Sequence, residues 1–194
     1  MTEEEYLSFI QPYDDALNNI QVRIDVLNKD YRRKKLNYPI HHVQYRLKQR
    51  ESIENKLTKY GKDPTTDAAR NCLTDIGGIR VICYFVRDIY GIVDLLCKQT
   101  DIDVIKESDY IKTPKANGYR SYHIVFGVPV YHTDGMEYYP VEVQLRTMAM
   151  DLWASMEHRI CYKGEKKDEA VEEFKNYGAA LKQMEEEMEG FLSD

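Results

Sequence analysis

Residues 79–86 read Ile-Arg-Val-Ile-Cys-Tyr-Phe-Val, an almost unbroken run of β-branched, aromatic and aliphatic side chains. A short run of this kind is typical of a strand that is buried on both faces of a sheet. Three further strands are predicted downstream, at residues 102–105, 119–130 and 136–145. His132-Thr133-Asp134-Gly135 joins the last two of them and is a hairpin signal. The middle of the chain is therefore predicted to form a sheet, with a helix at residues 89–99 between its strands.

Helices are predicted at both ends, where apolar residues recur every three or four positions and mark one helix face. The N-terminal stripe consists of Ile10, Tyr13, Leu17, Ile20, Ile24, Leu27 and Tyr31. The C-terminal stripe consists of Tyr177, Leu181, Met184, Met188 and Phe191. Pro12 is expected in the first turn of the N-terminal helix, where its missing N–H costs little. A second helix is predicted from Val43 to Lys59, so that strands in the middle and helices around them define an α+β fold.

The composition describes an ordinary folded protein and argues against several classes of function. The 194 residues suffice for one compact domain plus terminal helices, and 43% of them are hydrophobic and 31% charged. The four cysteines lie far apart, without a Cys-x-x-Cys pair, which argues against a zinc site and a disulfide framework. No apolar run approaches the roughly 20 residues that cross a bilayer. We therefore expect a cytoplasmic protein without a membrane partner.

Charge is distributed unevenly along the sequence. The formal net charge of −6 disfavours a stable nucleic-acid partner, because such binding depends on basic side chains that neutralise phosphates. Residues 29–56 are nevertheless strongly basic, whereas the tail from Asp168 onward is rich in glutamate. A local basic cluster in an acidic chain suits a compact polyphosphate ligand better than a long duplex.

Two carboxylates are predicted to form a metal site. In the last predicted strand, alternation places Glu142, Gln144 and Arg146 together on one face. Asp75 precedes a pair of glycines at the entrance to the apolar strand quoted above. If these two strands pair, Asp75 and Glu142 can share one Mg²⁺, a cation that takes one or two carboxylates together with substrate phosphates. Taken alone, Glu142 fits a solvated sheet face and Asp75 fits a turn or a cap.

The segment of residues 114–123 concentrates donors and aromatic rings between a flexible loop and the start of a strand. Its Asn117-Gly118 pair permits a tight turn, and Lys115 and Arg120 can meet phosphates. Tyr119 offers a face on which a base can stack, an interaction worth roughly 1–3 kcal/mol. Taken alone, the segment is also explained by a turn with an incidental tyrosine, because the chain contains 16 tyrosines.

A second group of polar side chains falls in the helix predicted from Val43 to Lys59. Lys48, Ser52 and Lys56 follow one another at intervals of four, so a helix would align them as a strip suited to a triphosphate. Arg46 could reach around the same helix to stack on a purine. Taken alone, this pattern is also explained by a solvated basic helix face.

Together these motifs resemble the synthetase domain of the RelA/SpoT family, and specifically its small single-domain members. The resemblance extends from about Pro39 to Lys163. Its most specific parts are Asp75-Ile76-Gly77-Gly78-Ile79-Arg80, Asn117-Gly118-Tyr119-Arg120-Ser121-Tyr122-His123, Val141-Glu142-Val143-Gln144-Leu145-Arg146-Thr147, Trp153 and Glu157-His158. Each part is short, and it is their order and spacing along the chain that carry the resemblance.

The resemblance implies a nucleotidyltransferase-like fold, in which helices flank a mixed sheet. It also implies transfer of the β,γ-pyrophosphate of ATP to the 3′-hydroxyl of GDP or GTP, and possible use of GMP, with Mg²⁺ as cofactor and release of AMP. The donor nucleotide is then expected at Arg46, Lys48, Ser52, Lys56 and Arg80. The acceptor nucleotide is expected at Lys115, Asn117, Tyr119, Arg120, His123 and Gln144. Asp75 and Glu142 would hold the metal, and Glu142 would also accept the proton of the 3′-hydroxyl.

The resemblance also implies an organisation for the whole chain. Residues 1–36 are expected to form a helix for packing or oligomerisation, residues 37–164 the synthetase domain, and residues 165–194 an acidic helix. Small family members are often ring-like tetramers built through terminal helices, so a homotetramer is expected. No histidine/aspartate hydrolase motif precedes the synthetase region, which predicts alarmone synthesis without alarmone degradation. On the first helix Asp25 accompanies Arg23, which argues against regulation by a second alarmone.

Two other functions are compatible with the sequence. A toxin-like synthetase of the same fold would transfer pyrophosphate to the 3′ end of tRNA, and the basic residues 32–35 fit such a substrate. The net negative charge argues against it. A non-catalytic nucleotide or RNA sensor would keep the pocket without the chemistry, and the presence of both Asp75 and Glu142 favours an enzyme over a sensor.

Overall fold

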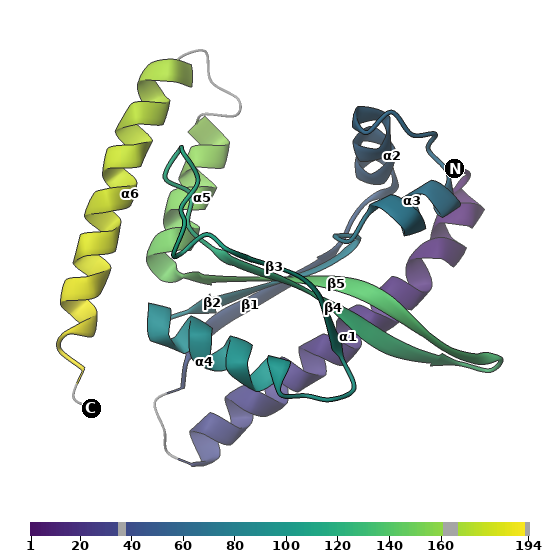
Figure 1. Ribbon diagram of the computed structural model, residues 1–194, viewed down its shortest axis with the longest axis horizontal. Helices are drawn as coiled ribbons and strands as arrows, with labels where there is room; N and C mark the ends of the chain where they lie inside the picture. Colours follow the sequence, from purple (N-terminus) through teal and green to yellow (C-terminus); the bar gives the residue numbers. More distant parts are fainter. Residues whose placement is uncertain (35–37, 161–166, 193–194) are drawn as a thin grey trace.

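A twisted sheet lies at the centre of the computed structural model, which describes residues 1–34, 38–160 and 167–192 (Figure 1). The helices are α1 (Glu3–Arg33), α2 (Arg50–Lys59), α3 (Thr66–Cys72), α4 (Val86–Cys97), α5 (Met148–Ile160) and α6 (Lys167–Glu189). The strands are β1 (Ile40–Leu47), β2 (Gly77–Cys83), β3 (Asp103–Asp109), β4 (Tyr122–His132) and β5 (Gly135–Thr147). The predicted α+β fold, with long helices at both ends, is confirmed.

The five strands lie in the order β1-β2-β5-β4-β3. β2 and β5 are parallel, whereas the other neighbouring pairs are antiparallel, so the sheet is mixed, as expected. The predicted hairpin is also confirmed, because β4 and β5 pair as far as His132 and Gly135. A parallel pair requires a crossover, and the chain passes through α4, β3 and β4 before it returns as β5 beside β2.

One face of the sheet is apolar and is covered by α1 and α4, which lie on the same side of it (Figure 1). The buried stripe of α1 includes Tyr13, Leu17, Ile20 and Ile24, each at most 2% exposed. These side chains share one core with Val141, Val143 and Leu145 of β5, which are fully buried. Burying a large aliphatic side chain contributes roughly 1.5–3 kcal/mol, so α1 stabilises the sheet directly.

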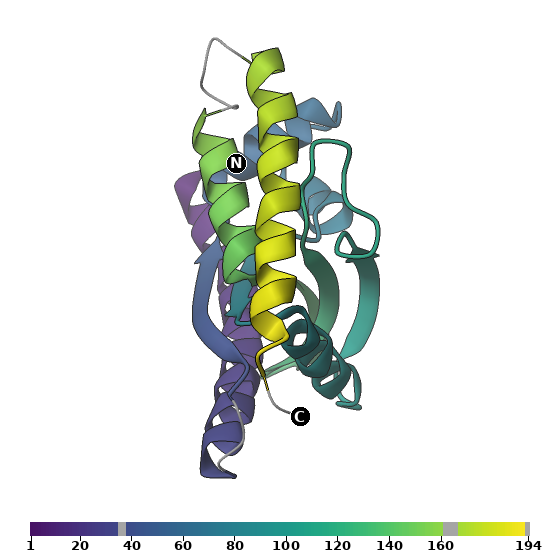
Figure 2. The same cartoon turned by 90° about the vertical axis from the view of Figure 1, so that its left-hand side faces the viewer.

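The opposite face of the sheet is polar and lies between two groups of helices. Figure 1 shows α2 and α3 above one end of the sheet and α5 above the other, with α6 beside α5 and continuing down past the end of the sheet. In the view turned by 90°, α6 runs alongside α5 (Figure 2). The two helices are joined by Trp153 and Phe174, since Trp153 Nε1 donates a hydrogen bond of 2.6 Å to the carbonyl oxygen of Phe174.

The helix predicted from Val43 to Lys59 is wrong in its first half. Residues 40–47 form the edge strand β1, which pairs antiparallel with β2 and places Arg46 opposite Gly78. Most side chains of β1 are exposed, so the strand is held by main-chain pairing with a distant segment and leaves little apolar alternation in the sequence. The helix α2 begins only at Arg50.

The start of α1 also differs from the prediction. The helix begins at Glu3, where Thr2 is the N-cap: its hydroxyl oxygen accepts a hydrogen bond of 3.1 Å from Glu5 N. The Glu5 carboxylate in turn accepts one of 2.7 Å from Thr2 N, which completes a capping box. Pro12 therefore lies inside α1 and not in its first turn, and its ring removes one main-chain hydrogen bond from the helix.

The division of the chain into three parts stays a prediction. Its boundaries, after residues 36 and 164, lie outside the described residues. α1 belongs to the core of the sheet, whereas α6 packs on α5. In the described part of the chain, no helix combines the length and the apolar character that a membrane span requires.

Candidate active site

The polar face of the sheet carries a cavity of about 230 Å³ over β1, β2 and β5. Strand register explains which side chains meet there: Gly78 is paired with both Arg46 and Glu142, and Arg80 is paired with Gln144. Alternate residues of neighbouring strands point to the same side, so these positions share one face. The cavity is lined by Gln44, Tyr45, Arg46, Asp75, Gly78, Ile79, Arg80, Glu142 and Gln144.

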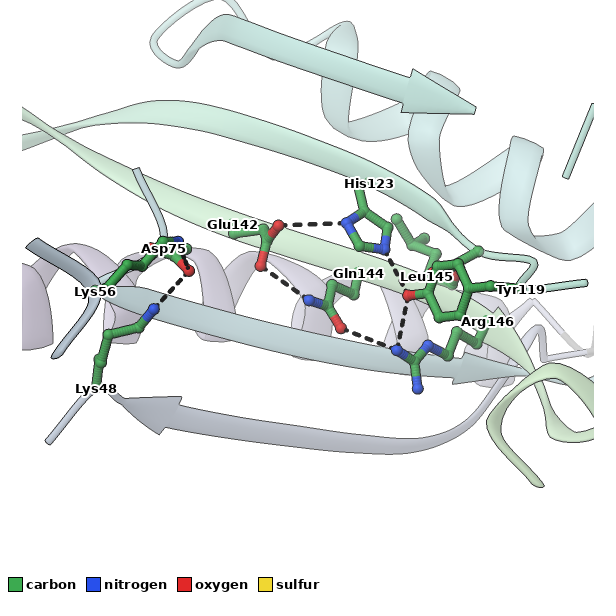
Figure 3. A network of polar contacts seen from close by, with 10 residues as sticks. Lys48, Lys56, Asp75, Tyr119, His123, Glu142, Gln144, Leu145 and Arg146 are labelled. Carbon is green, nitrogen blue, oxygen red and sulfur yellow. Dashed lines mark hydrogen bonds and ion pairs between the residues drawn. The ribbon is translucent and has the colours of Figure 1, made fainter. Parts of the chain in front are cut away.

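The two predicted metal ligands, Asp75 and Glu142, lie together in this cavity (Figure 3). Asp75 comes three residues before Gly78, which is the partner of Glu142 in the parallel pair of β2 and β5. Gly78 has no side chain, so nothing from that position separates the two carboxylates. These two residues are 67 positions apart in the sequence. They come together because β2 pairs with β5, which is the condition that the sequence analysis set for a shared metal site.

Asp75 is held by two lysines. Its Oδ2 atom lies 2.5 Å from Lys48 Nζ and 2.7 Å from Lys56 Nζ, whereas its Oδ1 atom is buried and has no hydrogen-bond partner among the described residues. Burial raises the pKa of Asp75, but the hydrogen bonds and charges of the two lysines outweigh burial and hold it below its ordinary value. Asp75 is therefore ionised at neutral pH and keeps one oxygen without a partner.

Lys48 and Lys56 reach Asp75 from different elements. Lys56 lies on α2, as predicted, but Lys48 belongs to the short connection between β1 and α2 and not to a helix. Burial lowers the pKa of Lys48, and its contact with Asp75 only partly offsets this effect. Ser52 lies one turn before Lys56 on α2 and is exposed. Of the expected strip of Lys48, Ser52 and Lys56, the structure brings the two lysines together at Asp75, and the strip is not one face of a helix.

Glu142 belongs to a closed ring of polar contacts (Figure 3). Its two oxygens lie 3.3 Å from His123 Nδ1 and 2.9 Å from Gln144 Nε2, which donates a hydrogen bond. Beyond them, His123 Nε2 lies 2.8 Å from the Tyr119 hydroxyl, and Arg146 Nη2 donates to this hydroxyl at 2.8 Å and to Gln144 Oε1 at 3.4 Å. These contacts fix the side chains expected around the acceptor nucleotide relative to Glu142.

The environment of Glu142 sets its charge. Burial raises the pKa of Glu142, and the nearby charge of Asp75 raises it further. The hydrogen bonds with His123 and Gln144 outweigh both effects and hold the pKa below its ordinary value. Glu142 is therefore a carboxylate at neutral pH, which suits a metal ligand, whereas a lowered pKa makes it a weak base.

Arg46 and Arg80, the two arginines expected to hold a purine, lie near each other on β1 and β2 and line the same cavity. Arg46 is exposed, whereas the side chain of Arg80 is one-third exposed. Burial lowers the pKa of Arg80, and the positive charge of Arg146 lowers it further. Two guanidinium planes at one end of the cavity provide surfaces for a base, because arginine stacks well on aromatic rings.

Lys115 and Asn117 lie in the loop that leads to β4, close to Tyr119. Lys115 Nζ is 4.9 Å from the centre of the Tyr119 ring and 4.7 Å from that of Tyr110. Asn117 Oδ1 accepts a hydrogen bond of 3.2 Å from Tyr119 N, and Asn117 Nδ2 donates one of 3.4 Å to Glu157 of α5. The structure thus brings Lys115, Asn117 and Tyr119 together with His123, as predicted from the sequence motif.

Arg120 is the one predicted site residue that the structure places elsewhere. Its side chain is 10% exposed and points toward α6, where Arg120 Nη2 lies 3.5 Å from Glu185 Oε2. The physical reason is alternation: Tyr119 and His123 share one side of the extended segment, so Arg120 points to the other. The expectation that Arg120 meets nucleotide phosphates is not supported by this arrangement, which gives it a partner in the C-terminal helix.

The sequence analysis assigned no site role to Arg146 or Asp151, which the structure places beside the candidate site. Arg146 lies on the predicted polar face of β5, and its side chain is 7% exposed between Tyr119 and Asp151. Asp151 Oδ1 lies 3.0 Å from Arg146 Nη1 and 3.5 Å from Arg80 Nη1. The alternation of β5 could have added Arg146, whereas no pattern in the sequence links Asp151 to two strands.

The donor atoms present fit a hard divalent cation. In the part of the chain that the structure describes, no group of three or more His, Cys, Asp or Glu side chains could hold a metal. Asp75 and Glu142 instead offer two carboxylates in one cavity, with Asp75 Oδ1 buried and unpartnered. Two carboxylates without thiolates suit Mg²⁺, which completes its coordination with waters and substrate phosphates.

Two carboxylates on a mixed sheet, with lysines and arginines around them and an aromatic ring beside them, define a class of protein. This combination is typical of enzymes that transfer phosphate-containing groups, because such reactions depend on alignment and on neutralisation of charge. Comparisons with known proteins give the same class. The family model described as "Region found in RelA / SpoT proteins" matches residues 45–167.

Similar proteins and structures cover most of the chain. GTP pyrophosphokinase YwaC of Bacillus subtilis (strain 168) is 41% identical over 160 residues, or 82% of this chain and 76% of that protein. A GTP pyrophosphokinase family protein from Streptococcus pneumoniae has a TM-score of 0.86 at 36% identity, over 98% of this chain and 93% of that one. Small alarmone synthetase 1 from Bacillus subtilis, bound to its product pppGpp, has a TM-score of 0.88 at 30% identity, over 97% and 96% of the two chains.

The chain belongs to the RelA/SpoT family, and the resemblance found in its motifs is confirmed. The matched region begins inside β1 and ends at the start of α6, so it contains both carboxylates and the loop before β4. The nucleotidyltransferase-like arrangement of a mixed sheet flanked by helices is shared with the solved small alarmone synthetases.

Proposed function

We propose that this chain is a GTP pyrophosphokinase, which transfers the β,γ-pyrophosphate of ATP to the 3′-hydroxyl of GDP or GTP and releases AMP. One observation carries the proposal: Asp75 and Glu142 lie in one cavity that Arg46 and Arg80 also line, and Glu142 is linked through His123 to Tyr119. Its relatives with the printed name GTP pyrophosphokinase support it. So does the similarity to a small alarmone synthetase bound to pppGpp.

The donor nucleotide would lie over β1 and β2. Arg46 and Arg80 line the cavity and would hold adenine between their guanidinium planes. Lys48 and Lys56 contact Asp75, and Ser52 lies one turn before Lys56 on α2; these three side chains would contact the phosphates. Both lysines now form ion pairs with Asp75. A bound phosphate would replace Asp75 as their anionic partner, so neither ammonium group would be left without a counter-charge.

The acceptor nucleotide would lie over β4 and β5. Tyr119 would stack on guanine, a contact worth roughly 1–3 kcal/mol. Lys115 would reach the acceptor phosphates, while Asn117, His123 and Gln144 would surround the sugar and the base. The polar ring around Glu142 holds Tyr119, His123 and Gln144 in place before the nucleotide binds, which lowers the entropy lost on binding.

Asp75 and Glu142 would hold Mg²⁺, which supplies charge neutralisation for the transferred pyrophosphate when it is bound. Glu142 would also accept the proton of the attacking 3′-hydroxyl, at an oxygen that now contacts His123 or Gln144. Its lowered pKa makes it a weak base, so most of the rate acceleration would come from positioning and from the surrounding cations.

The chain would work as a cytoplasmic homotetramer with three parts, residues 1–36, 37–164 and 165–194. Apolar side chains remain exposed on both helices of the C-terminal pair. Those on α5 are Met148, Leu152, Met156 and Ile160, spaced four apart along one face. Those on and after α6 are Val171, Tyr177, Met184, Met188 and Phe191. Exposed apolar side chains aligned along a helix favour association, and light scattering that finds a monomer at micromolar concentration would contradict the tetramer.

Chromatography of the reaction products tests the proposed function. The purified chain is incubated with ATP and Mg²⁺ and, in separate reactions, with GMP, GDP, GTP and deacylated tRNA. We expect AMP together with a guanine nucleotide that has gained two phosphates. Label that passes from ATP into tRNA, or no transfer to any acceptor, would contradict the proposal. A reaction with the product and Mn²⁺ tests the absence of alarmone degradation, because a hydrolase would return GDP or GTP.

A further inference from the structure

Asp151, in the first turn of α5, contacts one side chain from each half of the candidate site. Its Oδ1 atom lies 3.0 Å from Arg146 Nη1 and 3.5 Å from Arg80 Nη1. In the part of the chain that the structure describes, no other carboxylate forms an ion pair with either arginine. One oxygen atom is therefore shared by two guanidinium groups that repel each other.

Arg80 is the more loosely held of the two arginines. Its Nη1 atom makes two long contacts, each of 3.5 Å, with Gln44 Oε1 and with Asp151 Oδ1. The Nε atoms of both arginines are buried without a hydrogen-bond partner among the described residues, so the two differ in the contacts of their terminal nitrogens. Arg80 also lines the cavity, so a base that stacks there can draw its guanidinium away from Asp151 with little loss of existing contacts.

Arg146 connects Asp151 to the acceptor side. Arg146 Nη2 donates a hydrogen bond of 2.8 Å to the Tyr119 hydroxyl, and its guanidinium carbon lies 5.3 Å from the centre of the Tyr119 ring. The same nitrogen lies 3.4 Å from Gln144 Oε1, the neighbour of Glu142 in the polar ring. The position of Tyr119 therefore depends on Arg146, and the position of Arg146 depends on Asp151.

We propose that Asp151 is a positioning residue that couples the donor and acceptor nucleotide sites. This inference rests on the proposed function, because it takes Arg80 as a contact of the donor base and Tyr119 as the contact of the acceptor base. When the donor draws Arg80 away, Asp151 Oδ1 keeps the other arginine, Arg146, as its partner and holds it more tightly. Tyr119 is then better ordered, so the acceptor binds with a smaller loss of entropy.

The coupling has a definite sign and is reciprocal. Donor binding tightens acceptor binding, and acceptor binding must tighten donor binding by the same factor. If Asp151 had a purely structural role, its replacement would weaken the binding of both nucleotides to a similar degree. The binding of one nucleotide would then not depend on the other. The two explanations therefore differ in a ratio of dissociation constants, which does not require turnover.

Isothermal titration calorimetry measures this ratio in the presence of Mg²⁺. The Kd for GDP is determined with and without a saturating ATP analogue that has a methylene group between its α- and β-phosphates, because this is the bond that the proposed transfer breaks. For the unmodified chain we expect the analogue to tighten GDP binding about fivefold or more. Asp151→Asn keeps the shape of the side chain and removes its charge, so the ratio should fall to about one. Asp94→Asn, on the exposed face of α4 and paired with Lys98, is the matched control and should keep the original ratio.

A second variant gives an independent test that does not alter Asp151. Arg80→Met removes the guanidinium that competes for Asp151 Oδ1. In this variant Arg146 pairs with Asp151 without competition from Arg80, even when no donor nucleotide is bound. We expect this variant to bind GDP, without the ATP analogue, more tightly than the unmodified chain does under the same conditions. GDP binding by Arg80→Met that is unchanged or weaker would overturn the proposal, even if Asp151→Asn cannot be purified in folded form.

Other outcomes separate this inference from the proposed function. A ratio near one in the unmodified chain, or an unaltered ratio in Asp151→Asn, contradicts the coupling alone, because the product assay can still find pyrophosphate transfer. Coupled binding of both nucleotides by a chain that transfers nothing contradicts the proposed function alone. Neither result can be mistaken for the other.

Discussion

The ammonium group of Lys115 lies 4.9 Å from the centre of the Tyr119 ring, so the ring on which an acceptor base would stack already contacts a cation. Tyr110 holds the same ammonium at 4.7 Å from its own ring centre. A cation–π contact of this kind contributes roughly 0.5–2 kcal/mol, whereas base stacking contributes roughly 1–3 kcal/mol. Stacking therefore displaces Lys115 most readily when its ammonium gains a phosphate in exchange.

Replacement of Tyr119 tests the role of its ring. We expect Tyr119→Ala to raise the KM for the guanine nucleotide about 5–150-fold, which corresponds to the loss of roughly 1–3 kcal/mol of stacking. The KM for ATP should change much less. Tyr119→Phe keeps the ring and loses only the contacts of the hydroxyl with His123 and Arg146, so its effect should be smaller. Steady-state kinetics with each substrate varied in turn would show an equal effect on both nucleotides if the ring served only to pack the fold.

Glu142→Gln separates chemistry from binding. The amide keeps the shape of the side chain and its contact with Gln144, but it cannot accept a proton and is a poorer ligand for a cation. We expect kcat to fall by about 10²–10⁴-fold, the range found for loss of a general base, with a smaller change in the KM of either nucleotide. Quantification of AMP release measures the fall. Turnover within a few fold of the unmodified chain would refute the assignment of Glu142.

Gly118 connects the acceptor loop to α6 and offers a backbone test. Its φ of +91° disfavours any residue with a side chain, and a Cβ there would come within 3.3 Å of the backbone of Lys175. Gly118→Ala should therefore shift the loop that carries Tyr119 and raise the KM for the guanine nucleotide more than that for ATP. Gly61→Ala is the matched control, because its φ is +66° and nothing lies within 4 Å of a Cβ at that position. Equal kinetic effects of the two substitutions would contradict the positioning of Tyr119 by this loop.

Much of the fold could be predicted because its elements carry periodic patterns. Val141, Val143 and Leu145 are fully buried and alternate with Glu142 and Gln144 on the polar face, as the sequence indicated. The edge strand β1 could not be predicted in this way. Most of its side chains are exposed, and its conformation depends on main-chain pairing with β2, at least 30 residues further along the chain.

The site was predictable where a motif is continuous and less so where it depends on contacts between distant elements. The loop before β4 placed Lys115, Asn117 and Tyr119 correctly beside His123. Arg120 belongs to the same motif, but the alternation of side chains turns it toward Glu185, and nothing in its own segment identifies that partner. Asp151 likewise acquires two partners only because α5 stands over the ends of β2 and β5.

The buried pair of Arg120 and Glu185 makes stability depend on pH. Their side chains are 10% and 5% exposed, and one nitrogen of Arg120 and one oxygen of Glu185 are buried without a hydrogen-bond partner in the described part of the chain. Burial raises the pKa of Glu185 above its ordinary value of 4.5, although the hydroxyl of Thr147 and the charge of Arg120 act in the opposite direction. A carboxyl group with a raised pKa in the folded state favours folding in its neutral form. Its contribution is fully present below the unfolded pKa and is lost as the pH rises through the folded pKa.

Glu185→Gln has no carboxyl group at this position, so comparison with this variant isolates the contribution of Glu185 to the pH dependence of stability. We expect the free energy of unfolding of the unmodified chain, relative to that of Glu185→Gln, to decrease as the pH rises from about 4.5 toward neutrality. Urea denaturation at several pH values measures both. Asp101→Asn is the control: a hydrogen bond with Arg23 lowers the pKa of Asp101, so its contribution is lost only as the pH falls below about 3.8. A difference between the unmodified chain and Glu185→Gln that is constant or that increases with pH would show that burial does not control the charge of Glu185, and that α6 is held on Arg120 by an ordinary ion pair.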